Sequence, residues 1–157
     1  MRVVIQRVKR ASITIEGDKA KQMGQGLVVL FAASKQDELD ASPELIEKLA
    51  MKIANLRIFS DSDGRMNLAA STLNLSLMVV SQFTLLADTK KGNRPSFIEA
   101  AEAESAKSIY NHFVEALNNY GWTEFLTGKF GAHMDIELVN DGPVTIIIDT
   151  KEWENHS

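Results

Sequence analysis

The chain has 157 residues, 45% of them hydrophobic, which fits one compact domain with an apolar core. It contains no cysteine, so disulfide bonds and thiolate metal sites are excluded. Its net charge is −4, and no apolar run approaches the roughly 20 residues that cross a bilayer. We therefore expect a cytoplasmic protein with no membrane partner.

The first third of the chain predicts strands followed by a helix. Residues 1–8 and 11–17 run or alternate apolar, so we expect a strand pair with a turn between its members. Residues 26–34 predict a buried strand. Ser42 and Pro43 supply an N-cap and a first-turn proline, and apolar residues then recur at helical spacing. A helix over about 43–56 follows.

The remaining elements alternate between strands and one longer helix. They are a polar turn at 59–67, the longest strand at 75–88, a helix near 98–120 ending at a Gly121 cap, and short strands near 123–127, 132–139 and 144–150. We expect a mixed α/β (α+β) fold. Its single compact domain over residues 1–150 would have mainly antiparallel or mixed sheets, with two main helices on one side, and residues 151–157 would form a C-terminal tail.

Several common catalytic motifs are absent. The three histidines fit no zinc-binding spacing, no glycine-rich phosphate loop occurs, and there is no G-x-S-x-G elbow. Asp61-x-Asp63-Gly64 begins like a calcium loop, but position 72 is a threonine where a bidentate glutamate belongs. We expect no metal and no cofactor.

The sequence "SQFT" at 81–84 places polar side chains on both faces of the predicted long strand. A buried hydroxyl or amide without a partner costs about 1–3 kcal/mol, so these groups need partners. Two readings stay open. The strand either surfaces into a loop, or its end delivers Ser81, Gln82 and Thr84 to a pocket.

Three further segments carry candidate binding residues. The loop at 89–97 contains Lys90, Lys91 and Arg94 without an acid, which favours phosphate contacts over ordinary solvated charge only if a pocket lies beside it. In "GKFGAHM" (128–134), Phe130 and Met134 either line a pocket for a flat base or fill a core bulge. In "NDGPVT" (140–145), the Gly-Pro pair read alone is a turn before a strand.

In this order, "SQFTL", "KKGNRPSF", "GKFGAHM" and "NDGPVT" resemble the D-aminoacyl-tRNA deacylases, a family of small cytosolic homodimers. The likeness spans residues 1–150. It implies hydrolysis of the ester that joins a D-amino acid, or glycine, to the 3′-terminal adenosine of tRNA. It also implies a tRNA partner and active sites at the interface of a homodimer.

The resemblance assigns roles to residues of this sequence. Those that would line the reaction site are Ser81, Gln82, Phe83 and Thr84. Gly142 and Pro143 match a Gly-cis-Pro that reaches from one subunit into the other's pocket and excludes L-aminoacyl groups, and Arg7 matches an arginine that holds it. Lys90, Lys91 and Arg94 become candidates for phosphates of the acceptor end.

An aminoacyl ester is already activated, so the enzyme has to position water and stabilise an oxyanion more than supply a strong nucleophile. We favour a scheme in which Gln82 and Thr84 orient the substrate and backbone N–H groups near Phe83 stabilise the oxyanion. A Thr84 nucleophile is the alternative. Two other functions stay open, namely a small Thr or Ser hydrolase of another ester or amide, and an RNA-binding module without catalysis.

Overall fold

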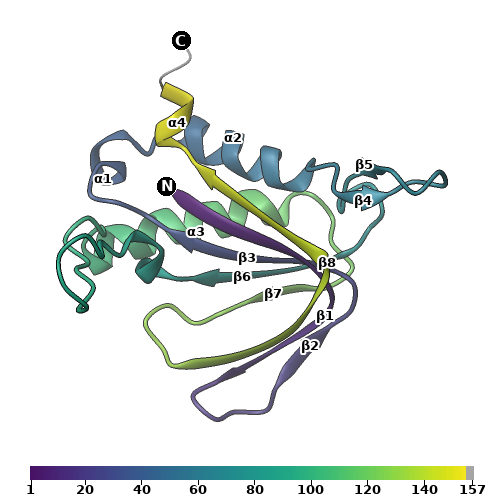
Figure 1. The fold of residues 1–157 in the computed structure, drawn as a ribbon, viewed down its shortest axis with the longest axis horizontal. Coiled ribbons are helices and arrows are strands. Elements are labelled where there is room, and N and C mark those ends of the chain that lie inside the picture. The colour runs from purple at the N-terminus through teal and green to yellow at the C-terminus, as the bar shows by residue number, and fades with distance from the viewer. Residues whose placement is uncertain (155–157) are drawn as a thin grey trace.

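The computed structural model describes residues 1–154. One sheet dominates it, with strand order β2-β1-β3-β6-β7 and with β8 also paired to β1 (Figure 1). The strands of this sheet are β1 (Arg2–Ile15), β2 (Lys21–Met23), β3 (Gly26–Ala32), β6 (Ser76–Ser81), β7 (Phe125–Thr127) and β8 (Met134–Asp149). β1 pairs antiparallel with β2, β3 and β8, whereas β3, β6 and β7 run parallel. The sheet is therefore mixed.

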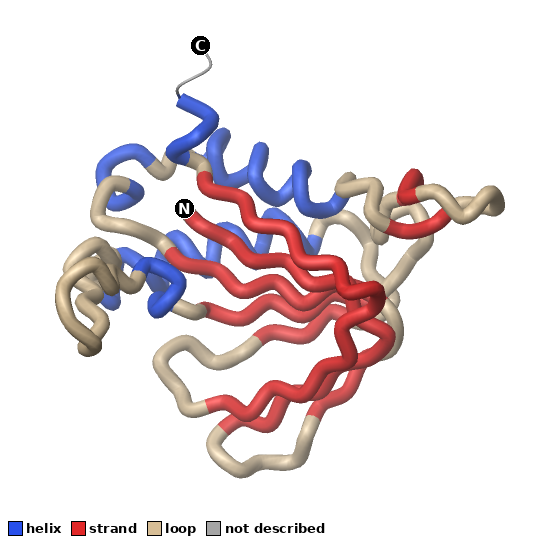
Figure 2. Tube along the Cα trace, in the orientation of Figure 1, coloured by secondary structure: helices blue, strands red, loops and turns tan. Residues whose placement is uncertain are grey.

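The two main helices, α2 (Pro43–Ala54) and α3 (Ala103–Asn118), lie side by side on one face of this sheet (Figure 2). Ser42 caps α2 as expected, since its side chain accepts a hydrogen bond from the Leu45 N–H. The smaller elements are α1 (Asp37–Asp40), β4 (Phe59–Ser60), β5 (Met66–Leu68), the 3₁₀ helix η1 (Phe83–Leu86) and α4 (Lys151–Glu154). The predicted fold class, a single mixed α/β domain, is confirmed.

Two hydrophobic cores lie on opposite faces of the sheet. The first packs Val3, Ile5 and Phe31 against apolar residues of α2 and α3. The second is enclosed where the far halves of β1 and β8, with β2, curl over the other face of β3 and β6, and it contains Val8, Ile13 and Met78 among others. The edge of the sheet where β3 and β6 end is open to a cavity.

The predicted strand pair at 1–8 and 11–17 is wrong, because β1 is one strand of 14 residues. The segment between them contains no glycine, proline, asparagine or aspartate that would favour a tight turn. The strand instead bends through two register irregularities, between Gln6 and Val8 and between Val8 and Arg10.

The predicted strand over 75–88 is also too long. β6 ends at Ser81, which pairs with Phe31, and β3 itself ends one residue later. Without a neighbouring strand to continue the ladder, the chain turns into η1. The expected alternation of polar residues on two strand faces therefore does not exist beyond Ser81.

Two other boundaries differ from expectation. α3 begins at Ala103, not near 98, because the preceding backbone bonds elsewhere: the Lys35 N–H donates to Glu99 O and the Ala101 N–H donates to Ala33 O. The predicted strands at 132–139 and 144–150 are one strand, β8, whose two halves both pair with β1. Gly142 and Pro143 thus lie within β8 rather than before it.

Candidate active site

A cavity of about 310 Å³ opens where β3 and β6 end. The carboxyl ends of parallel strands meet at one edge of a sheet, which is a common place for ligand sites. Its walls come from β3, β6, η1, α3, the segment between β7 and β8, and the start of β8. The lining residues are Phe31, Ala32, Ala33, Val80, Ser81, Gln82, Phe83, Ala106, Phe130, Gly131, Ala132, His133, Met134 and Ile136.

The polar wall of this cavity is the end of β6. The Gln82 N–H donates to Phe31 O at 2.7 Å, which fixes the backbone at the point where the ladder stops. The side-chain amide of Gln82 donates to Oγ1 of Thr84 in η1. Thr84 is exposed and does not line the cavity itself, but its hydrogen-bond partner Gln82 does.

The short helix η1 is anchored from behind by Arg2. Its guanidinium donates to Leu85 O at 2.9 Å and to the carboxylate of Asp149 at 2.8 Å. Within residues 1–154, the backbone N–H groups of Phe83 and Thr84 have no hydrogen-bond acceptor. Two free amide donors therefore lie at the start of a well-anchored turn beside Gln82.

The apolar wall comes from the "GKFGAHM" segment. A Cβ at Gly128 would lie 2.6 Å from the Met134 Sδ, so the absence of a side chain there lets Met134 pack inward. The Phe130 ring lies 6.1 Å from the ring of Tyr110. Tyr110 is buried and its hydroxyl donates to Val79 O at 2.9 Å, and burial raises the pKa of Tyr110 to about 12. Phe130 therefore lies beside an uncharged tyrosine whose position is fixed by a hydrogen bond.

The basic loop lies next to the cavity mouth. Asp88 and Ser96 pair through two backbone hydrogen bonds of 2.8 and 2.9 Å, which close the loop that carries Lys90, Lys91 and Arg94. These three side chains are exposed, and none of them forms an ion pair within the described residues.

An exposed aromatic pair stands between this loop and the polar wall. The Phe83 and Phe97 rings meet edge to face at 5.2 Å, and Phe83 is 53% exposed.

Gly142 and Pro143 lie elsewhere. Their peptide bond is cis, as the resemblance implied, and both residues are exposed. They line no part of the cavity. Their part of β8 faces Arg7, which pairs with Leu27, whereas the cavity wall at Ser81 pairs with Phe31. Four residues of strand amount to roughly 13 Å, so one chain does not bring the two motifs together.

Arg7 lies beside the Gly-Pro pair. Its Nε donates to Asp141 O at 3.0 Å and its Nη1 donates to Ile58 O at 2.5 Å. The carboxylate of Asp141 lies 3.5 Å from the guanidinium of Arg7, and the Arg7 side chain is only 11% exposed. Arg7 therefore ties this part of β8 to the segment after α2.

Sequence reasoning missed Asn140, which forms two hydrogen bonds with the backbone of Val144 across the same segment. An asparagine beside a Gly-Pro turn is a known sign of side-chain to backbone bonding, and that signal was present in "NDGP".

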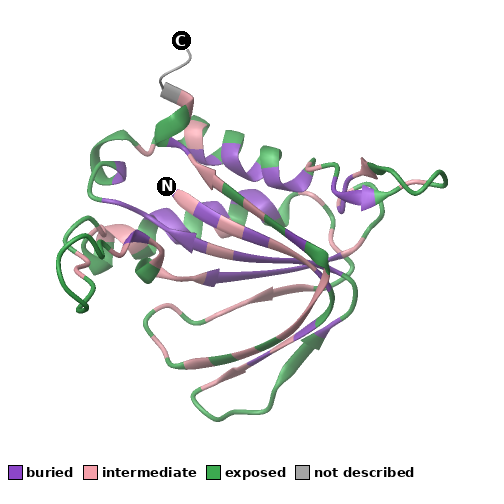
Figure 3. Cartoon of the chain, viewed as in Figure 1, coloured by how far each residue is buried: buried purple, intermediate pink, exposed green. Residues whose placement is uncertain are grey.

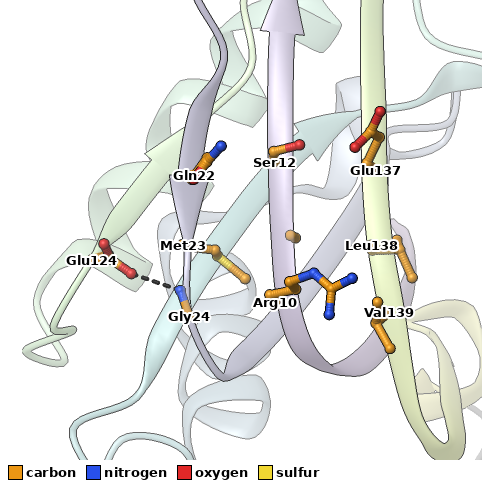
Figure 4. A pocket seen from close by; sticks show the side chains of 10 residues that line it. Arg10, Ser12, Gln22, Met23, Gly24, Glu124, Glu137, Leu138 and Val139 are labelled. Atoms are coloured by element: carbon orange, nitrogen blue, oxygen red, sulfur yellow. Dashed lines mark hydrogen bonds between the residues drawn. The ribbon is translucent and has the colours of Figure 1, made fainter.

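A second cavity, of about 540 Å³, lies over β2, β1 and β8 (Figure 4). Gln22, Ser12 and Glu137 form a cross-strand row on its floor, because Ser12 pairs with both neighbours. At the rim of this cavity, the carboxylate of Glu124 accepts a hydrogen bond from the Gly24 N–H at 2.8 Å. None of the candidate site residues from the sequence lines this second cavity. The cavity at the end of β6 is therefore the better candidate for the active site.

Within residues 1–154, no group of three or more His, Cys, Asp or Glu residues is arranged to hold a metal ion. Among the helices of the same residues, none combines the length and apolar character that a membrane crossing requires.

Comparison with known proteins gives consistent results. The family model described as D-Tyr-tRNA(Tyr) deacylase matches residues 4–149. A D-aminoacyl-tRNA deacylase of Dehalococcoides mccartyi strain BAV1 is 49% identical over 155 residues, covering 99% of this chain and 98% of the relative. Another of Thermosipho africanus is 49% identical over 152 residues, covering 97% and 99%.

Two solved structures are similar over nearly the whole chain. One, described as a c-Myc DNA unwinding element binding protein, has a TM-score of 0.85 and 38% identity, and covers 95% of this chain and 98% of its own. The other, described as a probable eukaryotic D-amino acid tRNA deacylase, has a TM-score of 0.84 and covers 94% and 98%. At 16% identity this second likeness concerns the fold alone.

Proposed function

Because this chain belongs to the D-Tyr-tRNA(Tyr) deacylase family, we propose that it hydrolyses the ester joining a D-amino acid, or glycine, to the 3′-terminal adenosine of tRNA. The observation that carries the proposal is the cavity at the end of β6. It gathers residues of two motifs about 50 positions apart, "SQFTL" and "GKFGAHM", around one opening. Such a substrate is found in the cytoplasm.

The polar wall suits hydrolysis of an activated ester. Since Oγ1 of Thr84 accepts from Gln82, its own proton is directed elsewhere and can be donated to a substrate oxygen. The free N–H groups of Phe83 and Thr84 are donors for an oxyanion on the carbonyl. Water would then attack the carbonyl carbon held by these groups, and the bond from that carbon to the 3′-oxygen of the tRNA would break. A proton of the water passes to the leaving 3′-oxygen, a transfer that the neighbouring 2′-hydroxyl can assist.

A Thr84 nucleophile has less support. A threonine hydroxyl needs a base within hydrogen-bonding distance, and no His, Asp, Glu or Lys side chain bonds to Thr84 within residues 1–154. The rival hydrolase of another ester or amide would use a threonine or serine nucleophile, and the Ser81 hydroxyl likewise bonds to no such side chain within residues 1–154.

The opposite wall suits the adenosine. Phe130 supplies an aromatic ring and Met134 an apolar side chain, and the Phe83–Phe97 pair adds an exposed aromatic edge. Lys90, Lys91 and Arg94 extend from the adjoining loop, where phosphates of the acceptor end would lie.

We assign selection against L-aminoacyl groups to Gly142 and Pro143 of a second subunit. The pair is exposed and lies too far along the sheet to reach the cavity of its own chain. Figure 3 shows exposed residues where β8 bends. Ile147, 67% exposed, faces away from the helices, because its neighbours Ile146 and Ile148 pack on the helix side. A symmetric dimer would cover Ile147 and place the Gly-Pro pair of each subunit at the cavity of the other.

Mixed dimers test this arrangement. One subunit carries Gln82→Ala and Thr84→Ala, and the other carries Gly142→Ala, with different affinity tags for purification. Only the Gly142→Ala subunit has an intact cavity in this mixed dimer. If each Gly-Pro pair lies at the cavity of the other subunit, that cavity is completed by the unchanged Gly142 of its partner. The mixed dimer then recovers wild-type preference for D-Tyr-tRNA over L-Tyr-tRNA. A preference equal to that of the Gly142→Ala homodimer would place motif and cavity in the same subunit and contradict the proposal.

A further inference from the structure

The Gly-Pro pair sits in a local excursion of β8. Gln6 pairs with Thr145 and Val8 pairs with Asn140, so a single residue of β1, Arg7, faces the four residues Asp141 to Val144. Such an excursion has no cross-strand ladder to hold its shape. Its conformation depends on whatever side chains bond to it.

Asn140 closes the base of this excursion. Its Oδ1 accepts from the Val144 N–H at 3.0 Å, and its Nδ2 donates to Val144 O at 3.1 Å. The amide side chain thus bonds both backbone groups of Val144, as a neighbouring strand would. Among residues of this length, only asparagine offers a donor and an acceptor together at neutral pH.

We infer that Asn140 is a positioning residue for stereochemical selection, fixing where Gly142 and Pro143 stand in the other subunit's cavity. The inference rests on the role proposed above for that pair. Asn140 closes the excursion at Val144, whereas Arg7 holds it at Asp141 O. Neither residue has to touch the substrate.

Selection should be more sensitive to this contact than folding is. Rejection of an L side chain requires backbone atoms to stand where that side chain would go, and displacement by about 1 Å can relieve such a clash. Gly142 and Pro143 are exposed, so little of the chain's own packing holds them. The core beneath is supplied separately, by Val144, which is 7% exposed.

The test compares Asn140→Ala and Asn140→Asp with the wild type and with Ser42→Ala. Ser42 is a matched control because its side chain also bonds a backbone N–H, but it does so at the start of α2. The readouts are kcat/KM for D-Tyr-tRNA and for L-Tyr-tRNA, and Tm. Aspartate keeps the acceptor for Val144 N–H but turns a carboxylate oxygen toward Val144 O, so both Asn140 variants should lose selectivity.

The expected result is a fall of about tenfold or more in the D/L ratio of kcat/KM for both Asn140 variants. Alanine loses both hydrogen bonds, and aspartate loses one and sets a carboxylate oxygen against Val144 O. Ser42→Ala should lower Tm by a few degrees and leave the ratio unchanged. An unchanged ratio in Asn140→Ala, or in Asn140→Asp if the alanine variant does not fold, overturns the inference. Gly142→Ala in the same assay then separates two cases. If the Asn140 variants keep the wild-type ratio and Gly142→Ala changes it, only the role of Asn140 is wrong. If Gly142→Ala also keeps the wild-type ratio, the proposed role of the Gly-Pro pair is wrong as well.

Discussion

The side-chain amide of Gln82 donates a hydrogen bond to the hydroxyl oxygen of Thr84 at the edge of the candidate site. This pairing occupies one lone pair of the hydroxyl and leaves its proton available to a ligand. It favours Thr84 as a residue that orients the substrate, and the first prediction follows from it.

Replacing Thr84 by alanine should slow turnover of D-Tyr-tRNA by about 10- to 100-fold, which corresponds to the loss of one or two hydrogen bonds in the transition state. Thr84→Ser, which keeps the hydroxyl, should retain most activity. Single-turnover kinetics with a separate measurement of tRNA binding would check this. Complete loss of turnover with normal binding would instead identify Thr84 as the nucleophile.

Replacing Gly142 by alanine should weaken discrimination between D- and L-Tyr-tRNA. A Cβ there would lie 2.8 Å from Val144 Cγ2 and 2.9 Å from Val144 N, and the residue has a φ of +138°, which disfavours any side chain. The excursion must therefore shift. The comparison is the D/L ratio of kcat/KM for the variant and the wild type, and a variant with full discrimination would refute the assignment.

The double variant Lys90→Ala and Lys91→Ala should bind tRNA less tightly and with a flatter salt dependence. Each lost phosphate contact reduces the slope of log K against log[salt] by about 0.7–0.9, so a change of about 1–2 is expected. Filter binding at several salt concentrations measures the slope. Lys19→Ala with Lys52→Ala removes the same charge from exposed positions outside the loop and should leave it unchanged. Equal slopes in both double variants would rule out the loop as a tRNA contact.

Tyr110 should make the protein less stable at alkaline pH. Burial raises its pKa in the folded state to about 12, from the ordinary tyrosine value of 10.0, so the unfolded chain loses the proton first. The contribution is fully present below pH 10 and is lost as pH rises toward 12, at about 1.4 kcal/mol per pH unit. Urea unfolding at pH 9 and pH 11 should show a steeper loss for the wild type than for Tyr110→Phe, and parallel losses would contradict this origin.

Much of the fold was accessible from local patterns. Ser42-Pro43 marked the start of α2, and the apolar run of β3 marked a buried strand, because capping and burial act over a few residues. The errors came where a long-range partner decides. β6 stops at Ser81 because β3 ends beside it, and β8 continues past Pro143 because β1 pairs with both halves.

The candidate site divides in the same way. The motifs around Ser81 and Phe130 indicated candidate residues, but only the folded chain places both segments around one cavity. The sequence "NDGP" signals that Asn140 bonds to nearby backbone, but the two hydrogen bonds to Val144 depend on how far β8 departs from β1. That departure is set by pairing register, and a single sequence does not specify it.

The most direct test of the central claim is release of tyrosine from D-Tyr-tRNA and from L-Tyr-tRNA by the purified wild-type protein, with and without a chelator. We expect rapid release from the D substrate, little from the L substrate, and no effect of the chelator. Binding of tRNA without release, or equal release from both substrates, would contradict it.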